Sequence, residues 1–142
     1  MTTTVAPPVG VSADFARGVV ELDGIPYTVA VADTPDKLSR GLMLVENLSP
    51  LDGMLFVYDA ERIVSHWMKD TLIPLDIAFF DDDGFLVSVS TMETCLDGDC
   101  PSYASGGPAR YALEVPRGGF ADLPAGARLS VIGSLDGSGK EI

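Results

Sequence analysis

The apolar residues of this 142-residue chain occur in short, strand-length runs that are separated by turn residues. The most apolar stretch, HWMKDTLIPLDIAFF at residues 66–80, is itself interrupted by charged residues. A helix that crosses a bilayer needs about 20 consecutive apolar residues, so we expect no membrane insertion. Short runs rich in β-branched and aromatic residues are typical of strands. The pattern therefore predicts a mainly β fold.

Turn and capping residues divide the chain into candidate elements. Asp23-Gly24 separates two β-rich segments, which predicts a hairpin. A short helix is expected to begin at Thr34, which can cap it, with Pro35 in the first helical position. Other predicted strands are residues 53–58, 63–68, 75–81, 85–92, 109–116 and 127–133. Because no βαβ rhythm is present, we predict a mainly β (α+β) domain, a compact antiparallel barrel-like or two-sheet structure of about eight short strands with one short helix.

We expect a single globular domain over residues 15–133, because the length suits one hydrophobic core. The composition of residues 1–14 is typical of a flexible linker, and residues 134–142 form a polar, flexible tail. One interpretation is that an export signal precedes the linker. The other is that these residues are the frayed N-terminus of a cytosolic protein.

The charge balance narrows the classes of partner. Nine Lys and Arg residues stand against 21 Asp and Glu residues, giving a net charge of −12. Nucleic acids and anionic lipid surfaces are bound through basic patches. We therefore expect no nucleic-acid partner, and we expect a monomer.

Two cysteines, Cys95 and Cys100, flank the sequence Leu-Asp-Gly-Asp. Asp-Gly favours a tight turn, so the two thiols can come to lie opposite each other. A metal site would need more ligands, and a redox motif would have the spacing Cys-x-x-Cys. We therefore predict a structural disulfide, with no metal and no cofactor. A disulfide favours an oxidising, extracytoplasmic location.

Four motifs in order identify a resemblance that extends from Val19 to Val131. They are VADTPDKLSRGLM (31–43), GMLFVY (53–58), WMKDTLIPLDIAFFDDDG (67–84) and PARYALEVPRGG (108–119). Together they resemble the bacterial and archaeal family catalogued as domain of unknown function 192. The resemblance implies a compact β-rich domain that often follows an export signal, and it implies no biochemical function. The chain has His66 where the family usually has an aromatic residue, and Asp70 where it usually has Asn.

Charged residues within the apolar segment are the main candidates for a site. Asp76 lies in a strand whose two faces both carry apolar residues, so we expect it to be buried. A buried carboxylate must be paired, hydrogen-bonded or protonated. Lys69, Arg110 and the amides of the neighbouring turn are its possible partners. A structural role, in which Asp76 accepts backbone N–H groups, is an alternative to a role in a site.

Arg110 and Glu114 share one face of their strand, and Glu114 is a possible partner for Lys69. Surface pairing across strands is the alternative for both. The only histidine, His66, is interpreted as a half-buried strand residue rather than a ligand or a catalytic base.

These observations predict a pocket at the turn 69–74, with Lys69 at its rim, Asp76 as its floor and Trp67 as its wall. The predicted ligand-binding residues are Trp67, Lys69, Asp76, Arg110 and Glu114. The first functional hypothesis is the binding of a small polar molecule or a glycan. The second is an enzyme that uses a Lys/carboxylate pair for acid–base chemistry on a small polar substrate. The third is a protein–protein interaction module without a pocket.

Overall fold

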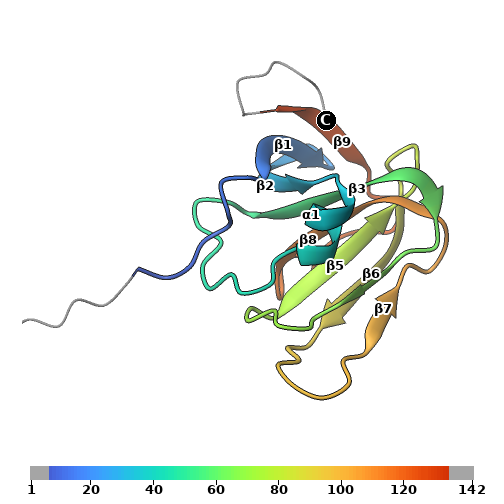
Figure 1. Ribbon diagram of the computed structural model, residues 1–142. Coiled ribbons are helices and arrows are strands. Elements are labelled where there is room, and N and C mark those ends of the chain that lie inside the picture. The colour runs from blue at the N-terminus through green and yellow to red at the C-terminus, as the bar shows by residue number, and fades with distance from the viewer. Residues whose placement is uncertain (1–6, 135–142) are drawn as a thin grey trace, which may run out of the picture.

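The computed structural model describes residues 7–134 and consists of a curled seven-stranded sheet, a two-stranded sheet and one short helix (Figure 1). The elements are β1 (Ala16–Leu22), β2 (Ile25–Ala32), α1 (Pro35–Arg40), β3 (Gly53–Arg62), β4 (Ser65–Trp67), β5 (Leu75–Phe80), β6 (Leu86–Met92), β7 (Ser102–Ala104), β8 (Ala109–Pro116) and β9 (Leu129–Ser134). The large sheet has the strand order β6-β5-β8-β3-β2-β1-β9, and β4 pairs with β7 in the small sheet. The predicted mainly β, barrel-like fold with one short helix is confirmed.

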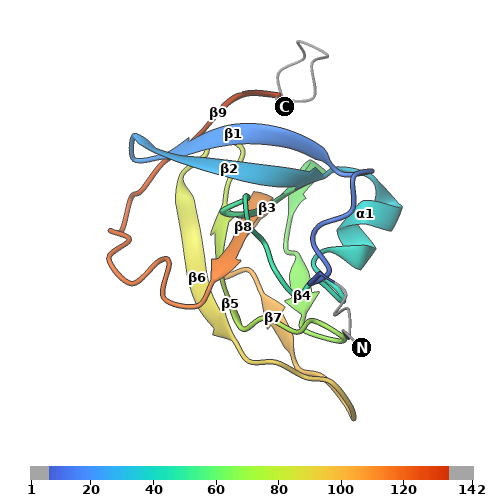
Figure 2. The ribbon, with the colours of Figure 1, turned by 90° about the vertical axis from the view of Figure 1, so that its left-hand side faces the viewer.

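Local sequence signals explain the first elements. The β1–β2 turn places Asp23 at φ 50° and Gly24 at φ 81°, the left-handed conformations that a two-residue hairpin turn requires. Figure 2 shows this hairpin crossing over one end of the curled sheet. The Thr34 side chain caps α1 by accepting a hydrogen bond from the Lys37 backbone N–H at 3.3 Å. The predicted hairpin and helix start are both confirmed.

Two features of the sheets differ from the sequence-based expectation. Strands β2 and β3 run parallel and are connected through α1, whereas all other strand pairs of the described residues are antiparallel. Strand β7, which the sequence did not predict, has three residues and forms by pairing with β4. Three residues are too few for an alternating pattern to be recognised.

Two apolar clusters lie on the two faces of the central strands. All residues of β5 are buried, as predicted. Leu75, Ile77 and Phe79 belong to one cluster, and Ala78 and Phe80 belong to the other. We call the first face, which β4 and β7 cover, the inner face, and the second the outer face.

The connection from β6 to β7 contains a disulfide between Cys95 and Cys100, whose Cα atoms lie 5.7 Å apart. Within residues 7–134, no helix has the length and apolar character needed to cross a membrane. Residues 1–6 of the predicted linker and 135–142 of the predicted tail lie outside the described residues. Residues 7–14 form no helix or strand, and the Val9 N–H donates to Glu46 Oε1 at 2.8 Å.

Candidate functional site

The small sheet carries His66 onto the inner face. Burial alternates along this segment: Val64, His66 and Met68 are buried, whereas Ser65 and Trp67 are exposed. The period of two is that of a strand with one face on the core. The side chain of His66 is thereby directed at the large sheet, and the residue is only 9% exposed to solvent.

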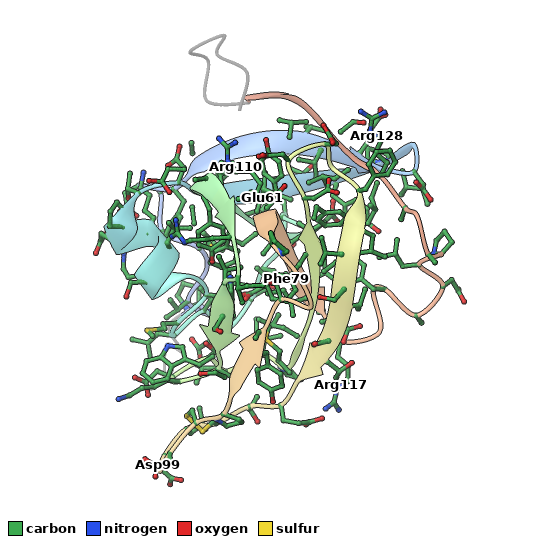
Figure 3. All side chains as sticks on the ribbon, turned by 90° about the vertical axis from the view of Figure 1, so that its right-hand side faces the viewer. Glu61, Phe79, Asp99, Arg110, Arg117 and Arg128 are labelled. Carbon is green, nitrogen blue, oxygen red and sulfur yellow. A yellow bond between two sulfur atoms is a disulfide. The ribbon has the colours of Figure 1, made fainter. Side chains whose placement is uncertain are left out.

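Aromatic rings surround the imidazole of His66. The ring of Phe56 lies 4.5 Å from it between centroids, that of Phe79 lies 5.7 Å away, and that of Tyr58 lies 6.1 Å away. All three contacts are edge-to-face, a preferred arrangement for such rings. Phe79 lies in the centre of the molecule (Figure 3). The histidine therefore stands in an apolar, aromatic environment.

Both nitrogen atoms of His66 form hydrogen bonds. Nδ1 lies 2.9 Å from Glu114 Oε2, and Nε2 lies 2.5 Å from the Tyr58 hydroxyl. Glu114 comes from β8 and is 4% exposed, and Tyr58 comes from β3 and is 8% exposed. The three side chains form a buried polar chain in the order Tyr58–His66–Glu114.

The proton positions in this chain follow from the donors available. A carboxylate only accepts, so Nδ1 of His66 carries the hydrogen that it donates to Glu114. Burial, and next the negative charge of Glu114, raise the pKa of Tyr58, so the hydroxyl keeps its proton. In the described part of the chain, Nε2 of His66 is the one hydrogen-bond partner of that hydroxyl. His66 thereby holds the Glu114 carboxylate in a fixed orientation.

A pocket of about 140 Å³ opens beside the hydrogen-bonded side chains of Tyr58, His66 and Glu114. Its wall is formed by Leu38, Ser39, Arg40, Gly41, Leu42, Met43, Phe56, Tyr58, Ser65, His66, Trp67, Thr71 and Glu114. These residues come from the α1 region on one side, from β4 and the turn after it on the other, and from β3 and β8 below. We call this the α1–β4 pocket.

One oxygen of Glu114 is available to the α1–β4 pocket. Oε2 accepts from His66, whereas Oε1 has no hydrogen-bond partner among the described residues. In the same part of the chain, no fully buried side-chain nitrogen or oxygen lacks a partner. Oε1 therefore keeps access to solvent, and the pocket that Glu114 lines provides it.

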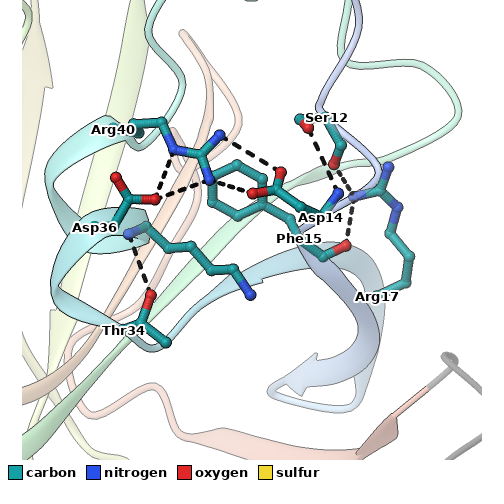
Figure 4. Close-up of polar contacts among 8 residues, drawn as sticks. Ser12, Asp14, Phe15, Arg17, Thr34, Asp36 and Arg40 are labelled. Atoms are coloured by element: carbon teal, nitrogen blue, oxygen red, sulfur yellow. Dashed lines mark hydrogen bonds and ion pairs between the residues drawn. The ribbon is translucent and has the colours of Figure 1, made fainter.

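Arg40 stands at the rim of the pocket, but its charge is matched by two carboxylates. Figure 4 shows its guanidinium between Asp14 and Asp36. Its Cζ also lies 4.7 Å from the centroid of the Phe15 ring. The hydrogen bond from Arg40 lowers the pKa of Asp14 to about 2, so the pair stays ionised at neutral pH.

One of the predicted site residues, Trp67, lies at the mouth of this pocket, and Lys69 lies beside its ring on the outside. Trp67 lines it and is 48% exposed. Lys69 is exposed, and its Nζ lies 5.5 Å from the centroid of the Trp67 ring, a cation–π distance. Lys69 does not line the pocket, and it forms no ion pair with any carboxylate in residues 7–134. Glu114, considered above as its partner, is bonded to His66 instead.

Asp76 lies apart from this pocket. It is 5% exposed, and it accepts from the Thr91 hydroxyl at 2.8 Å and from the Gly118 N–H at 2.9 Å. Successive strand residues point to opposite faces, which places Asp76 on the outer face with Ala78. Since Glu114 faces His66 on the inner side, the two carboxylates do not line one pocket. The contacts of Asp76 are those of the structural alternative.

Arg110 supports the site from outside. Its Nε donates to the backbone carbonyl of Tyr58, and its Nη1 lies 3.1 Å from Asp82 Oδ1. It lies near the edge of the molecule in Figure 3 and does not line the α1–β4 pocket. Its contact with the Tyr58 backbone fixes β3 where the polar chain begins.

The turn after β4 explains the residue type at position 70. Asp70 has φ 55°, and its carbonyl accepts from the Leu44 N–H at 2.8 Å. Asn and Asp tolerate this left-handed conformation better than other non-glycine residues do. Either residue can therefore form the turn that joins the two walls of the pocket.

His66 and Tyr58 are the site residues that sequence reasoning missed. The available signal was the alternation of Val64, His66 and Met68, which places the histidine on an apolar face. A buried histidine needs partners for its nitrogens, and the sequence did not say where they are. Within residues 7–134, no group of three or more His, Cys, Asp or Glu side chains is placed to hold a metal ion.

Comparisons with solved structures agree with this fold. The chain is 32% identical to a "putative transcription regulator" from Sinorhizobium meliloti 1021, with a TM-score of 0.72, over 82% of this chain and 94% of that one. It is 24% identical to a protein of unknown function from Novosphingobium aromaticivorans DSM 12444, with a TM-score of 0.73, over 92% and 99% of the two chains. The second likeness shows the fold alone.

No curated protein matches the chain. A family model does match: DUF192, described as "Uncharacterized ACR", over residues 18–131. This range contains every strand that builds the site and agrees with the resemblance found in the sequence. The chain belongs to the domain of unknown function 192 family.

Proposed function

We propose that this protein binds a small polar molecule, or one unit of a glycan, in the α1–β4 pocket. The observation that carries the proposal is Oε1 of Glu114, an acceptor on a buried side chain that has no partner among the described residues and opens onto a cavity. A carboxylate removed from bulk water costs free energy unless it is hydrogen-bonded. A ligand that donates to Oε1 would supply the missing bond.

The pocket has the size and composition of a small-molecule site. Its volume of about 140 Å³ is close to that of the ~150 Å³ cavity that accommodates a benzene ring in another protein. Ligand sites are commonly apolar, with a few placed polar groups. Here the apolar part comes from Phe56, Leu42 and Met43, and Glu114 is the fixed polar group.

The exposed Trp67 favours this pocket over other surface hollows. A large aromatic side chain that is 48% exposed beside a cavity offers an apolar face to a ligand. Trp67 is also the one tryptophan of the chain, so its fluorescence reports directly on the mouth of the pocket.

The proposal is tested by a thermal-shift screen with sugars, polyols, amino acids and small amines. A ligand that binds the folded state raises the melting temperature. Ser65→Phe would fill the mouth of the pocket and should abolish any shift seen with the wild type. Ser130→Phe, at an exposed position of β9, is the matched control and should leave the shift unchanged. A ligand that still stabilises the Ser65→Phe variant would contradict binding in this pocket.

We also infer that the protein works outside the cytoplasm as a monomer. The Cys95–Cys100 disulfide supports the location, because such bonds persist in oxidising compartments. Thiol alkylation of protein taken directly from cells, before and after reduction, tests it. Two freely alkylated cysteines without reduction would contradict it, and light scattering tests the monomer.

A further inference from the structure

We propose that the ligand of the α1–β4 pocket is a cation, namely a small organic ammonium. The inference rests on the proposed function and specifies the class of ligand.

The first step is the charge at the floor of the pocket. Glu114 is 4% exposed, and its one hydrogen-bond partner in the described residues is the imidazole of His66. The hydrogen bond from His66 orients the carboxylate through Oε2 and leaves Oε1 without a partner among the described residues. No Lys or Arg of residues 7–134 forms an ion pair with Glu114. Its ion-pair contact is with His66 Nδ1 at 2.9 Å, which carries a charge only when the imidazole is protonated. With an uncharged imidazole as its partner, the buried Glu114 carboxylate has no counter-charge, which is costly, so a cation is the ligand that gains most here.

The second step is the aromatic character of the wall. Phe56, Tyr58 and Trp67 all line the pocket together with Glu114. Aromatic faces attract cations, and ammonium ligands are bound by groups of such rings. The protein's own cations already show this attraction: Lys69 Nζ lies 5.5 Å from the Trp67 ring, and Arg62 Cζ lies 5.2 Å from the Tyr58 ring.

The third step concerns Arg40, the one cation in the lining of the pocket. It would repel a cationic ligand if its charge were free. It pairs instead with Asp14 and with Asp36, the latter at 3.1 Å. The hydrogen bond that Arg40 donates to Asp14 raises the pKa of Arg40, so this compensated arrangement persists. The pocket therefore retains the negative charge of Glu114.

The charge of the whole chain acts in the same direction. A net charge of −12 attracts cations and repels anions over distances longer than a single contact. Anionic ligands, such as phosphates or dicarboxylates, would meet both this field and Glu114. The ammonium class is thus favoured by the local site and by the surface.

The test compares two probes of the same shape. Choline carries a trimethylammonium group, and 3,3-dimethylbutan-1-ol replaces its nitrogen with carbon and is neutral. Titration of the wild-type protein, followed by Trp67 fluorescence, should give an affinity for choline about tenfold or more above that for the alcohol. Glucose serves as the neutral polyol probe. This comparison uses the wild-type protein and does not depend on the folding of a variant.

Two variants then locate the charge. Glu114→Gln keeps the shape of the side chain and should remove the preference for choline. Glu21→Gln changes the net charge equally on β1, away from the pocket, and should leave the preference intact. If Glu21→Gln weakened choline binding as much as Glu114→Gln does, the general field of the protein would explain the effect, and the site would be refuted.

The outcomes separate this inference from the proposed function. Equal or tighter binding of the neutral alcohol or of glucose would overturn the ammonium inference and leave small-molecule binding intact. An absence of binding by choline would also overturn it. The proposed function itself fails only if the wider thermal-shift screen finds no ligand that Ser65→Phe blocks.

Discussion

Replacement of His66 by phenylalanine tests whether the buried polar chain is organised as the distances indicate. Phenylalanine keeps a planar ring among the Phe56 and Phe79 rings, which lie 4.5 and 5.7 Å from the imidazole. It removes both nitrogen atoms. The variant therefore changes hydrogen bonding with little change in packing.

The expected cost follows from the two partners that lose their bonds. Glu114 Oε2 loses its donor and the Tyr58 hydroxyl loses its acceptor, both in positions less than a tenth exposed. An unsatisfied buried polar group costs about 1–3 kcal/mol, and more if it is charged. Because Glu114 keeps access to the pocket through Oε1, we expect His66→Phe to lower the free energy of unfolding by about 3 kcal/mol in total. This is a large share of the roughly 5–15 kcal/mol that stabilises a typical domain.

The assay is urea unfolding followed by Trp67 fluorescence. Adding Tyr58→Phe and Glu114→Leu to His66→Phe removes the stranded polar groups and should restore at least half of the lost stability. A His66→Phe variant within about 1 kcal/mol of the wild type at neutral pH would refute the reasoning. So would a triple variant no more stable than the single one.

Three further predictions concern the supports of the fold, each measured by denaturant or thermal unfolding. Asp76→Ala leaves a backbone N–H and a hydroxyl without their acceptor and should lower the free energy of unfolding by about 2–4 kcal/mol. The comparison variant Asp70→Gly, at a turn with φ 55°, should lower it by under about 1 kcal/mol. Equal losses in the two variants would contradict the burial of Asp76. Gly41→Ala should cost about 1–3 kcal/mol, because Gly41 has φ 47° and an added Cβ would lie 3.2 Å from a core aromatic ring; an unchanged melt would argue against this tight contact. Arg40 lowers the pKa of Asp14 from 3.8 to about 2, so the stability that this pair contributes is present above 3.8 and is lost as the pH falls through about 2. Thermal melts of wild type and Asp14→Asn should therefore differ at neutral pH and converge near pH 2, and a constant difference across that range would exclude the pair as its source.

Features encoded by neighbouring residues could be predicted from the sequence. Asp23-Gly24 forms the hairpin turn, Thr34 caps the helix, and Cys95 and Cys100 meet across their short turn. The burial of both faces of β5 could also be predicted, because consecutive residues of this strand, which point to opposite faces, are apolar. Each of these depends on interactions within a few residues or on a period of two along one strand.

The site was decided by the tertiary structure. Alternation shows which side chains share a face of a strand, but not which other strand that face meets. Glu114 lies 48 residues from His66, and it bonds to that histidine rather than to Lys69 because the small sheet folds over the inner face. Asp76 points to the opposite face, where its carboxylate accepts two hydrogen bonds. The burial of charge in the apolar segment was predictable from the sequence, whereas the partner of each charge was fixed only when long-range strand pairing set the register and the faces.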